Sequence, residues 1–200
     1  MRNALFAAAG LLLAAVAISA QGDMRPTCRN CPGTYIPNEE LQAYIKRAIA
    51  NRIVDQQVRA IDVGKTNVDI GIVHRGKLDA PAAGSVAEHD QVSEVYHILD
   101  GTATLVTGPD IVDAKRRPAD NEAVRLLNGP GSNGASIRNG ATHQLKAGDV
   151  IVIPAGTGHW FTKIDDHITY LMVRIDPDKV TPLKSEADSK AYLSKPHGGQ

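Results

Sequence analysis

The chain has 200 residues, a length that fits one domain or one domain with a tail. It carries 22 basic and 22 acidic side chains, and removing residues 1–20 would remove only Arg2, leaving one acidic side chain in excess. This balance argues against nucleic acid or an anionic membrane surface as the partner. It favours a small molecule or a second copy of the chain in a homodimer.

Residues 1–20 have the pattern of an export signal. Arg2 supplies a positive charge, residues 4–18 are apolar, and Ser19-Ala20 ends the segment with small residues. This pattern is typical of a cleavable signal peptide, and the apolar run is short for a membrane-spanning helix, which needs roughly 20 residues. An uncleaved N-terminal anchor is the alternative. We therefore expect a periplasmic or secreted protein with no stable membrane insertion after signal cleavage.

Both cysteines lie in the short segment Cys28-Arg29-Asn30-Cys31-Pro32. In a cytosolic protein this spacing indicates redox chemistry or half a zinc site. After an export signal it favours a small structural disulfide that pins the N-terminal arm. No thioredoxin-like strand–helix pattern surrounds the pair, and no histidine follows Cys31 for haem attachment.

Residues 21–57 are expected to form an N-terminal arm and one helix. The helix should begin at Pro37-Asn38, with Asn38 as the N-cap and Glu39-Glu40 in the first turn, where the helix dipole favours negative charge. Apolar positions then recur at helical spacing: Leu41, Tyr44, Ile45, Ala48, Ile49 and Ile53. One face of this helix should therefore pack on a larger body or on a second subunit.

From Val58 the period changes to that of β-strands, and residues 58–183 are expected to form one all-β domain. The predicted strands cover residues 58–63, 68–73, 95–99, 102–106, 124–127, 150–153, 159–164 and 168–175. We expect turns at Asp100-Gly101 and Asp165-Asp166, the second of which should close a hairpin. Residues 184–200 are polar and predict a weakly ordered tail.

Two stretches interrupt the strand pattern. Residues 108–121 contain the basic run Lys115-Arg116-Arg117, and residues 128–139 are rich in glycine, serine and asparagine. Long insertions in compact β folds serve as lids or as mobile surface loops. The basic run is expected to be a solvated face, with contact to an anionic substrate as the alternative.

The most informative run is residues 148–159, Gly-Asp-Val-Ile-Val-Ile-Pro-Ala-Gly-Thr-Gly-His. It predicts a turn, an apolar strand and a second turn, after which His159 opens the next strand. Upstream, His89 and Glu94 come just before another strand. Two histidines and one carboxylate can hold a metal ion, so His89, Glu94 and His159 are the candidate ligands. The first two can converge only if residues 90–93 bend the chain, because five residues along a straight strand reverse the face.

These two motifs resemble those of the cupin superfamily. In the first motif, Glu94 and Gly101 match the family spacing, and His89 matches the second histidine of a His-x-His pair. The second motif is matched at four positions: Gly148, Pro154, Gly156 and His159. The resemblance covers roughly residues 68–175. It implies an all-β fold, a double-stranded β-helix or jelly-roll barrel with one N-terminal helix, in a superfamily where homodimers are common.

The chain departs from the family pattern at two positions. Ala87 stands where the first histidine of the pair is usual, and Lys163 stands where an asparagine is usual. The resemblance thus implies a three-ligand site for a divalent metal ion, which can be iron, zinc or manganese. Lys163 offers a competing arrangement, in which it forms an ion pair with Glu94 in place of the metal.

Strand alternation places Tyr96 on the face of Glu94 and Phe161 on the face of His159, so both should line the cavity. Tyr96 is the candidate catalytic residue, as a donor of a proton or hydrogen bond to substrate, and packing is its alternative role. We expect an exported metal-binding cupin that acts on a small organic molecule as a dioxygenase, isomerase or lyase. The alternative is a non-catalytic small-molecule-binding cupin with a degenerate, metal-free pocket.

Overall fold

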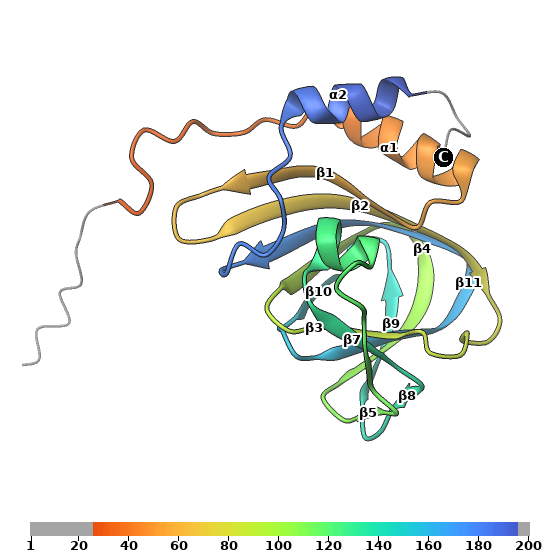
Figure 1. Ribbon diagram of the computed structural model, residues 1–200. Coiled ribbons are helices and arrows are strands. Elements are labelled where there is room, and N and C mark those ends of the chain that lie inside the picture. The colour runs from red at the N-terminus through yellow and green to blue at the C-terminus, as the bar shows by residue number, and fades with distance from the viewer. Residues whose placement is uncertain (1–25, 196–200) are drawn as a thin grey trace, which may run out of the picture.

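The structure is a computed structural model that describes residues 26–195. Figure 1 shows a curved sheet closed into a barrel, with two helices across one of its walls. The elements are α1 (Asn38–Asn51), β1 (Asp55–Asp62), β2 (Asn67–Leu78), β3 (Val86–His89), β4 (Ser93–Gly108), β5 (Ile111–Val112), β6 (Lys115–Arg116), η1 (Val124–Asn128), β7 (Gly131–Gly134), β8 (Ser136–Ile137), β9 (Ala141–Lys146), β10 (Val150–Ile153), β11 (Gly158–Asp176) and α2 (Glu186–Ser194). The predominance of antiparallel strands confirms the all-β, jelly-roll prediction.

Strands β4 and β11 form the centre of the barrel wall and pair with each other along almost their whole length. Each continues through a predicted turn, Asp100-Gly101 in β4 and Asp165-Asp166 in β11, without reversing. The register between the two strands shifts at this level, so both strands bend together. Gly101 has a φ of +84°, and a Cβ there would overlap the carbonyl oxygen of His167. Both turn predictions, including the hairpin, are therefore wrong.

The strand predicted at residues 124–127 is also wrong, because this segment forms the helical turn η1. The side-chain oxygen of Asn121 accepts a hydrogen bond from the Ala123 N–H at 3.0 Å, and its backbone carbonyl accepts one from the Arg125 N–H at 3.0 Å. An asparagine that binds nearby backbone in this way favours turns and helix starts over strands. Local polar contacts thus outweigh the apolar run that suggested a strand.

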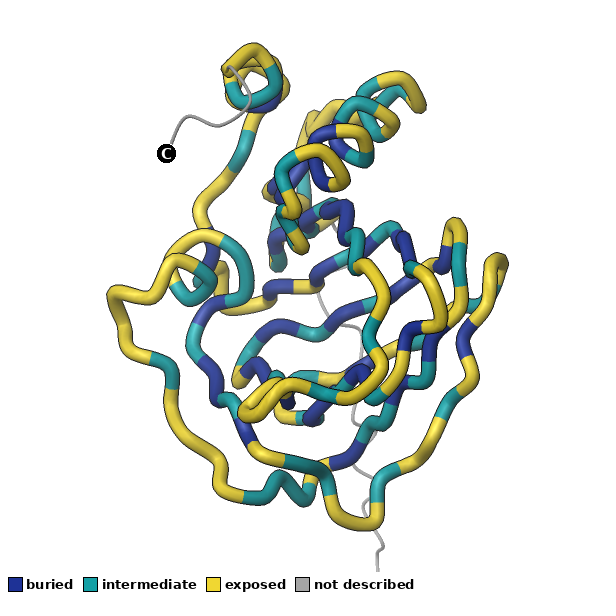
Figure 2. The backbone as a smooth tube through the Cα atoms, turned by 90° about the vertical axis from the view of Figure 1, so that its right-hand side faces the viewer, coloured by how far each residue is buried: buried dark blue, intermediate teal, exposed yellow. Residues whose placement is uncertain are grey.

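The barrel interior is an apolar core. One cluster of buried side chains fills it: Val73, Tyr96, Ile98, Ala103, Leu105, Leu145, Ile153, Phe161, Ile164, Ile168, Tyr170 and Met172. A smaller cluster between the sheet and the helices is built on Tyr44, Val58 and Ile72. Figure 2 shows the buried residues along the strands and on the inner side of the helices. Each large apolar side chain buried in this way contributes about 1.5–3 kcal/mol.

Helix α1 lies across the sheet with Tyr44 and Ala48 buried, as its apolar spacing predicts. Its start differs from the prediction in one detail. Pro37 occupies the N-cap position and no side chain caps the helix, so Asn38 is the first helical residue. The Asn38 side chain instead accepts a hydrogen bond from Gln42 at 3.5 Å.

The C-terminal segment forms the helix α2 over residues 186–194, where the sequence suggested weak order. Ser185 and Asp188 make a reciprocal capping box at its start. Tyr192 stacks on Tyr44 of α1 with ring centroids 5.5 Å apart, and the hydroxyl of Tyr44 donates to buried Ser189 at 3.1 Å. Contacts between the two helices thus stabilise a helix in a segment whose polar composition had suggested weak order.

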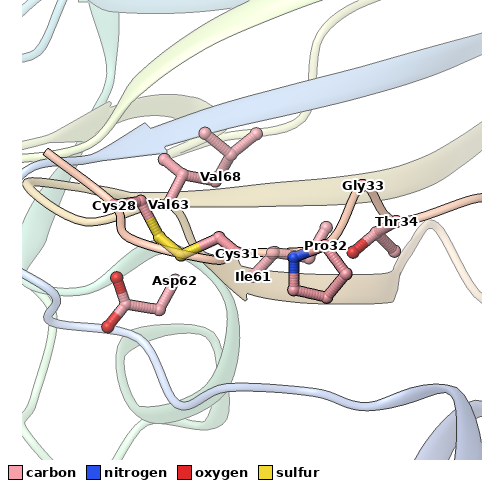
Figure 3. A pocket seen from close by; sticks show the side chains of 9 residues that line it. All are labelled: Cys28, Cys31, Pro32, Gly33, Thr34, Ile61, Asp62, Val63 and Val68. Carbon is pink, nitrogen blue, oxygen red and sulfur yellow. A yellow bond between two sulfur atoms is a disulfide. The ribbon is translucent and has the colours of Figure 1, made fainter. Parts of the chain in front are cut away.

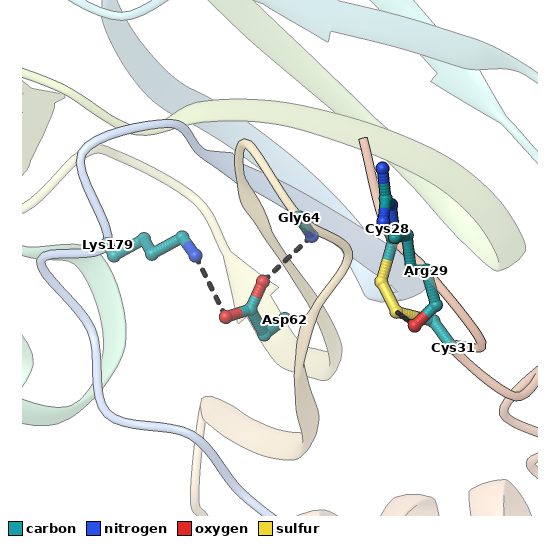
Figure 4. The surroundings of a disulfide bond; sticks show 6 residues. All are labelled: Cys28, Arg29, Cys31, Asp62, Gly64 and Lys179. Atoms are coloured by element: carbon teal, nitrogen blue, oxygen red, sulfur yellow. Dashed lines mark hydrogen bonds and ion pairs between the residues drawn. A yellow bond between two sulfur atoms is a disulfide. The ribbon is translucent and has the colours of Figure 1, made fainter. Parts of the chain in front are cut away.

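The disulfide between Cys28 and Cys31 is present, which confirms its prediction. Figure 4 shows it beside the β1–β2 turn, where Asp62 accepts hydrogen bonds from the Gly64 N–H and from Lys179, both at 2.8 Å. A cavity of about 370 Å³ lies between the disulfide segment and the ends of β1 and β2 (Figure 3). The disulfide therefore holds the arm compact where it crosses the first hairpin.

The predicted signal peptide at residues 1–20 lies outside the described part of the chain and stays a prediction. Within residues 26–195, no helix is both long enough and apolar enough to cross a membrane. The expected division into residues 21–57, 58–183 and 184–200 is likewise still a prediction, although α2 gives the last segment a structure of its own.

Candidate metal centre

The three predicted metal ligands converge inside the barrel. His89 ends β3, Glu94 lies at the start of β4, and His159 lies at the start of β11. The Nε2 atoms of His89 and His159 lie 3.4 Å and 3.6 Å from the two carboxylate oxygens of Glu94. All three side chains are buried, and one ligand atom from each lies within 4.8 Å of the others. The donor set and its spacing fit a divalent metal ion held by two imidazoles and a carboxylate.

The bend required between His89 and Glu94 is present. Residues 90–92 leave the strand, and the Asp90 N–H donates to the carbonyl of Pro130 at 3.0 Å. The turn of the second motif is fastened to the same place, because the Gly156 N–H donates to the carbonyl of His89 at 2.8 Å. Backbone hydrogen bonds therefore join the two motifs and hold their ligands on one side of the barrel.

His159 is oriented as a metal ligand requires. Its Nδ1 lies 3.3 Å from the carbonyl oxygen of Thr157, which only accepts hydrogen bonds, so Nδ1 carries the proton. In the neutral imidazole, Nε2 then presents its lone pair toward Glu94. Burial lowers the pKa of His159 and thus favours this neutral form. An unprotonated nitrogen facing a carboxylate oxygen is an arrangement that a cation between them would stabilise.

His89 has a different partner. Its Nδ1 lies 3.0 Å from Nη2 of Arg117, whose guanidinium only donates hydrogen bonds. Nδ1 therefore accepts, and the proton of the neutral imidazole lies on Nε2, directed toward Glu94. Burial lowers the pKa of His89 to about 3, so the ring is neutral near pH 7. The two histidines thus face the same carboxylate in opposite tautomers.

Glu94 is held as a carboxylate by its neighbours. The hydroxyl of Tyr96 donates to it at 2.6 Å, and the guanidinium of Arg174 lies 3.4 Å from its other oxygen. Burial by itself would raise the pKa of Glu94, but His89, His159, Arg174 and the Tyr96 hydrogen bond outweigh this effect and lower the pKa to about 2. Arg174 is itself fully buried, and Gln57 and Asp55 bind the rest of its guanidinium.

Tyr96 is buried next to the three ligands, on the face that alternation predicts, and belongs with Phe161 to the core cluster that fills the barrel. Its ring meets that of His159 edge to face, with centroids 6.3 Å apart. Burial raises the pKa of Tyr96 well above its usual range, so the hydroxyl stays protonated and donates a hydrogen bond to Glu94. The observed contact is therefore with a candidate metal ligand, and the catalytic role of Tyr96 stays a prediction.

Lys163 does not compete for the site. Its side chain is about 60% exposed and pairs with Asp165 at 2.7 Å. Simple alternation from His159 through Phe161 would point Lys163 inward, but the register shifts between Phe161 and Lys163 and turns it outward. The structure therefore rules out the alternative arrangement, a Lys163–Glu94 ion pair, and Arg174 is the cation that binds Glu94.

Three arginines surround the site. The sequence interpretation assigned none of them to it. Arg174 shares an inward face with Tyr170 and Met172, so strand alternation could have found it. Arg117 comes from the basic run expected to be a solvated face, and no local pattern points to its contact with His89. Arg75 extends over the ring of Phe161 at 4.9 Å, and its Nε donates to the hydroxyl of Tyr170 at 3.5 Å.

The family comparison matches residues 135–197 of the chain to the AraC-like ligand binding domain. This range includes the second motif with His159 and leaves out His89 and Glu94. The match covers about a third of the chain, and together with the barrel and the spacing of the two motifs it supports the resemblance to the cupin superfamily. No curated protein matches the chain.

Several solved structures are similar to the chain at low identity. A protein from Bacillus halodurans is 14% identical, with a TM-score of 0.43, and the match covers 81% of this chain and 97% of that one. A cupin protein from Bacteroides fragilis is 16% identical, with a TM-score of 0.37 and coverage of 78% and 93%. The DMSP lyase DddQ from Ruegeria pomeroyi is 15% identical, with a TM-score of 0.38, over 64% of this chain and 49% of that one. None of these likenesses bears on the activity of the chain.

Proposed function

We propose that the chain is a metal-binding cupin in which His89, Glu94 and His159 hold one divalent ion and act on a small organic molecule. The observation that carries the proposal is the geometry around Glu94, whose two oxygens each face an imidazole Nε2 at 3.4–3.6 Å. Burial supports it further, because a water-poor site strengthens the attraction between a carboxylate and a cation. The ion would be iron, zinc or manganese.

A bound ion would supply Lewis acidity or a site for dioxygen at its open coordination positions. The residues of the chain keep the donor set ready for it. Arg174 and Tyr96 hold Glu94 anionic and fix its plane, and the Thr157 carbonyl fixes the tautomer of His159. The cupin fold serves several reaction types, so the choice among dioxygenase, isomerase and lyase rests on the substrate and not on the barrel.

Metal analysis of purified protein tests the proposal. After reconstitution with iron(II), zinc or manganese and removal of excess ion, we expect about one equivalent per chain. His159→Ala and Glu94→Gln should lose it. His97→Ala is the matched control, because this histidine of β4 is exposed and lies on the face opposite to Glu94 and Tyr96. Metal content that is substoichiometric in the wild type and unchanged in His159→Ala would refute the proposal.

A metal-free, small-molecule-binding cupin is the second candidate function. It is favoured by two contacts that satisfy the site without a metal: Arg174 with Glu94 and Arg117 with His89. The matched family, a ligand binding domain, supports binding of a small molecule under either proposal. A thermal-shift screen of organic acids and sugars with and without chelator separates the two, because a metal-free binder keeps its ligand response when chelator is present.

We also propose that the protein is exported to the periplasm or secreted, and that it forms a homodimer. The composition of residues 1–20 and the Cys28–Cys31 disulfide support export. The exposed valines of strand β10, Val150 at 61% and Val152 at 62%, support a subunit contact on this face. Light scattering of wild-type protein and of a Val150→Lys, Val152→Lys variant tests the dimer, which should dissociate in the variant.

A further inference from the structure

Arg117 is held in a fixed position by four acceptors. Its Nη2 donates to the carbonyl of Glu88 at 2.6 Å and to Nδ1 of His89 at 3.0 Å. Its Nη1 donates to the carbonyl of Ser132 at 3.1 Å and to the side-chain oxygen of Asn133 at 3.3 Å. These four bonds account for the four protons on the two terminal nitrogens. The guanidinium therefore cannot turn away from His89 without losing other bonds.

The contact determines which nitrogen of His89 is available. Because Arg117 donates to Nδ1, the single proton of the neutral ring lies on Nε2. A metal ion placed between His89, Glu94 and His159 needs the lone pair of that same Nε2. Metal-ligating histidines ordinarily donate their other ring N–H to an acceptor, as His159 does to Thr157. At His89 the partner is a donor instead.

We propose that Arg117 opposes metal loading, so that ligation by His89 and the Arg117–His89 hydrogen bond exclude each other. Loading transfers the ring proton from Nε2 to Nδ1, by way of solvent and with no net change in protonation, and the guanidinium must withdraw from Nδ1. The positive charge of Arg117 adds a repulsion between guanidinium and metal ion. The inference rests on the proposed metal site and assigns to the 108–121 insertion a part in controlling it.

Zinc affinity of two matched variants tests this role. Arg117→Met removes the charge and the donors but keeps an unbranched apolar side chain. Arg116→Met removes the same charge from the neighbouring residue, which is exposed and pairs with Asp90 at 2.5 Å without touching His89. In a competition titration with a chromogenic chelator, we expect Arg117→Met to bind zinc about tenfold more tightly than the wild type. Arg116→Met should bind within about twofold of the wild type.

The outcomes separate this inference from the proposed function. Zinc binding by the wild type that is equal or tighter than that of Arg117→Met overturns the inference and leaves the metal site standing. Binding by Arg117→Met alone supports the inference and contradicts the proposed function of the wild-type chain. Absence of binding in both proteins overturns both.

The histidine tautomers give a second test that needs no variant. In ¹⁵N spectra of metal-free wild-type protein, His89 should carry its proton on Nε2 and His159 on Nδ1. Saturation with zinc should move the His89 proton to Nδ1 and leave that of His159 in place. A metal-free His89 protonated on Nδ1 overturns the inference, even where Arg117→Met fails to fold.

Discussion

Two histidine pairs among residues 26–195 lie beside carboxylates, one pair inside the barrel and the other near its surface. His89 and His159 lie inside the barrel, where burial lowers the pKa of both rings. His74 and His167 stack 5.7 Å apart near the surface, beside a cavity of about 330 Å³ under α1. There, hydrogen bonds to Asp166 and Asp100 raise the pKa of His167.

This difference shows that proximity of histidine and carboxylate does not by itself define a metal site. Burial removes the proton from the inner pair and leaves nitrogens that can ligate, whereas exposed carboxylates keep the proton on His167. Among residues 26–195, only His89, Glu94 and His159 form a converging group of at least three metal-binding side chains. The outer pair instead fastens the bend that β4 and β11 share, because His167 bridges Asp100 and Asp166.

Removal of Arg174, the buried cation beside Glu94, should have the largest effect on stability. Arg174→Met should lower the free energy of unfolding by about 3–5 kcal/mol, because Glu94 and Asp55 lose their buried partner. Urea denaturation measures the loss. Arg138→Met, which breaks the exposed pair with Asp110, should cost less than about 1 kcal/mol. Similar losses of unfolding free energy in the two variants would show that the buried charge of Arg174 adds no more stability than an exposed one.

Acid should destabilise the protein through the inner pair. The folded-state pKa of His89 is about 3, below the ordinary 6.5, so from pH 6.5 down to about 3 the unfolded chain binds a proton that the folded chain does not. The free energy of unfolding should therefore fall in this window by up to about 1.4 kcal/mol per pH unit. His89→Gln should flatten the profile measured by urea denaturation. A slope unchanged by this substitution would place the titrating groups elsewhere.

His167 of the outer pair should show a smaller effect with the opposite sign, whereas burial lowers the pKa of its neighbour His74, as it does in the inner pair. The pKa of His167 is raised, so its charged form contributes stability that is present below pH 6.5 and is lost as the pH rises through the folded-state pKa. His167→Gln should therefore cost more stability near pH 5 than near pH 8, and less than about 1 kcal/mol at either because the ring is partly exposed. Thermal melts at the two pH values measure this. Equal losses would mean that the ring acts by packing and not by charge.

The motif spacing was sufficient to predict the barrel and the three converging side chains. Glu94 and His159 follow directly from turn and strand chemistry, and His89 follows once residues 90–92 bend the chain. Lys163 was misplaced because alternation assumes an unbroken strand, and one register shift reverses its face.

Other parts of the site depend on contacts that no local pattern encodes. Arg117 reaches His89 only because β6 pairs with β7 and brings the insertion beside β3. The predicted turns at Asp100-Gly101 and Asp165-Asp166 were wrong for the same reason, because both strands continue through them. A glycine or a pair of aspartates indicates a change of direction, but only the partner strand decides between a bend and a reversal.

The long pairing of β4 with β11 also has a kinetic consequence. Glu94 and His159 are far apart in the sequence, and closing the intervening loop costs entropy before strand contacts repay it. An unfolded chain therefore offers no preformed set of three donors. Ion capture at this site would follow closure of the barrel, and a bound ion would then slow the reopening of its last strand, so that occupancy and the lifetime of the folded state rise together.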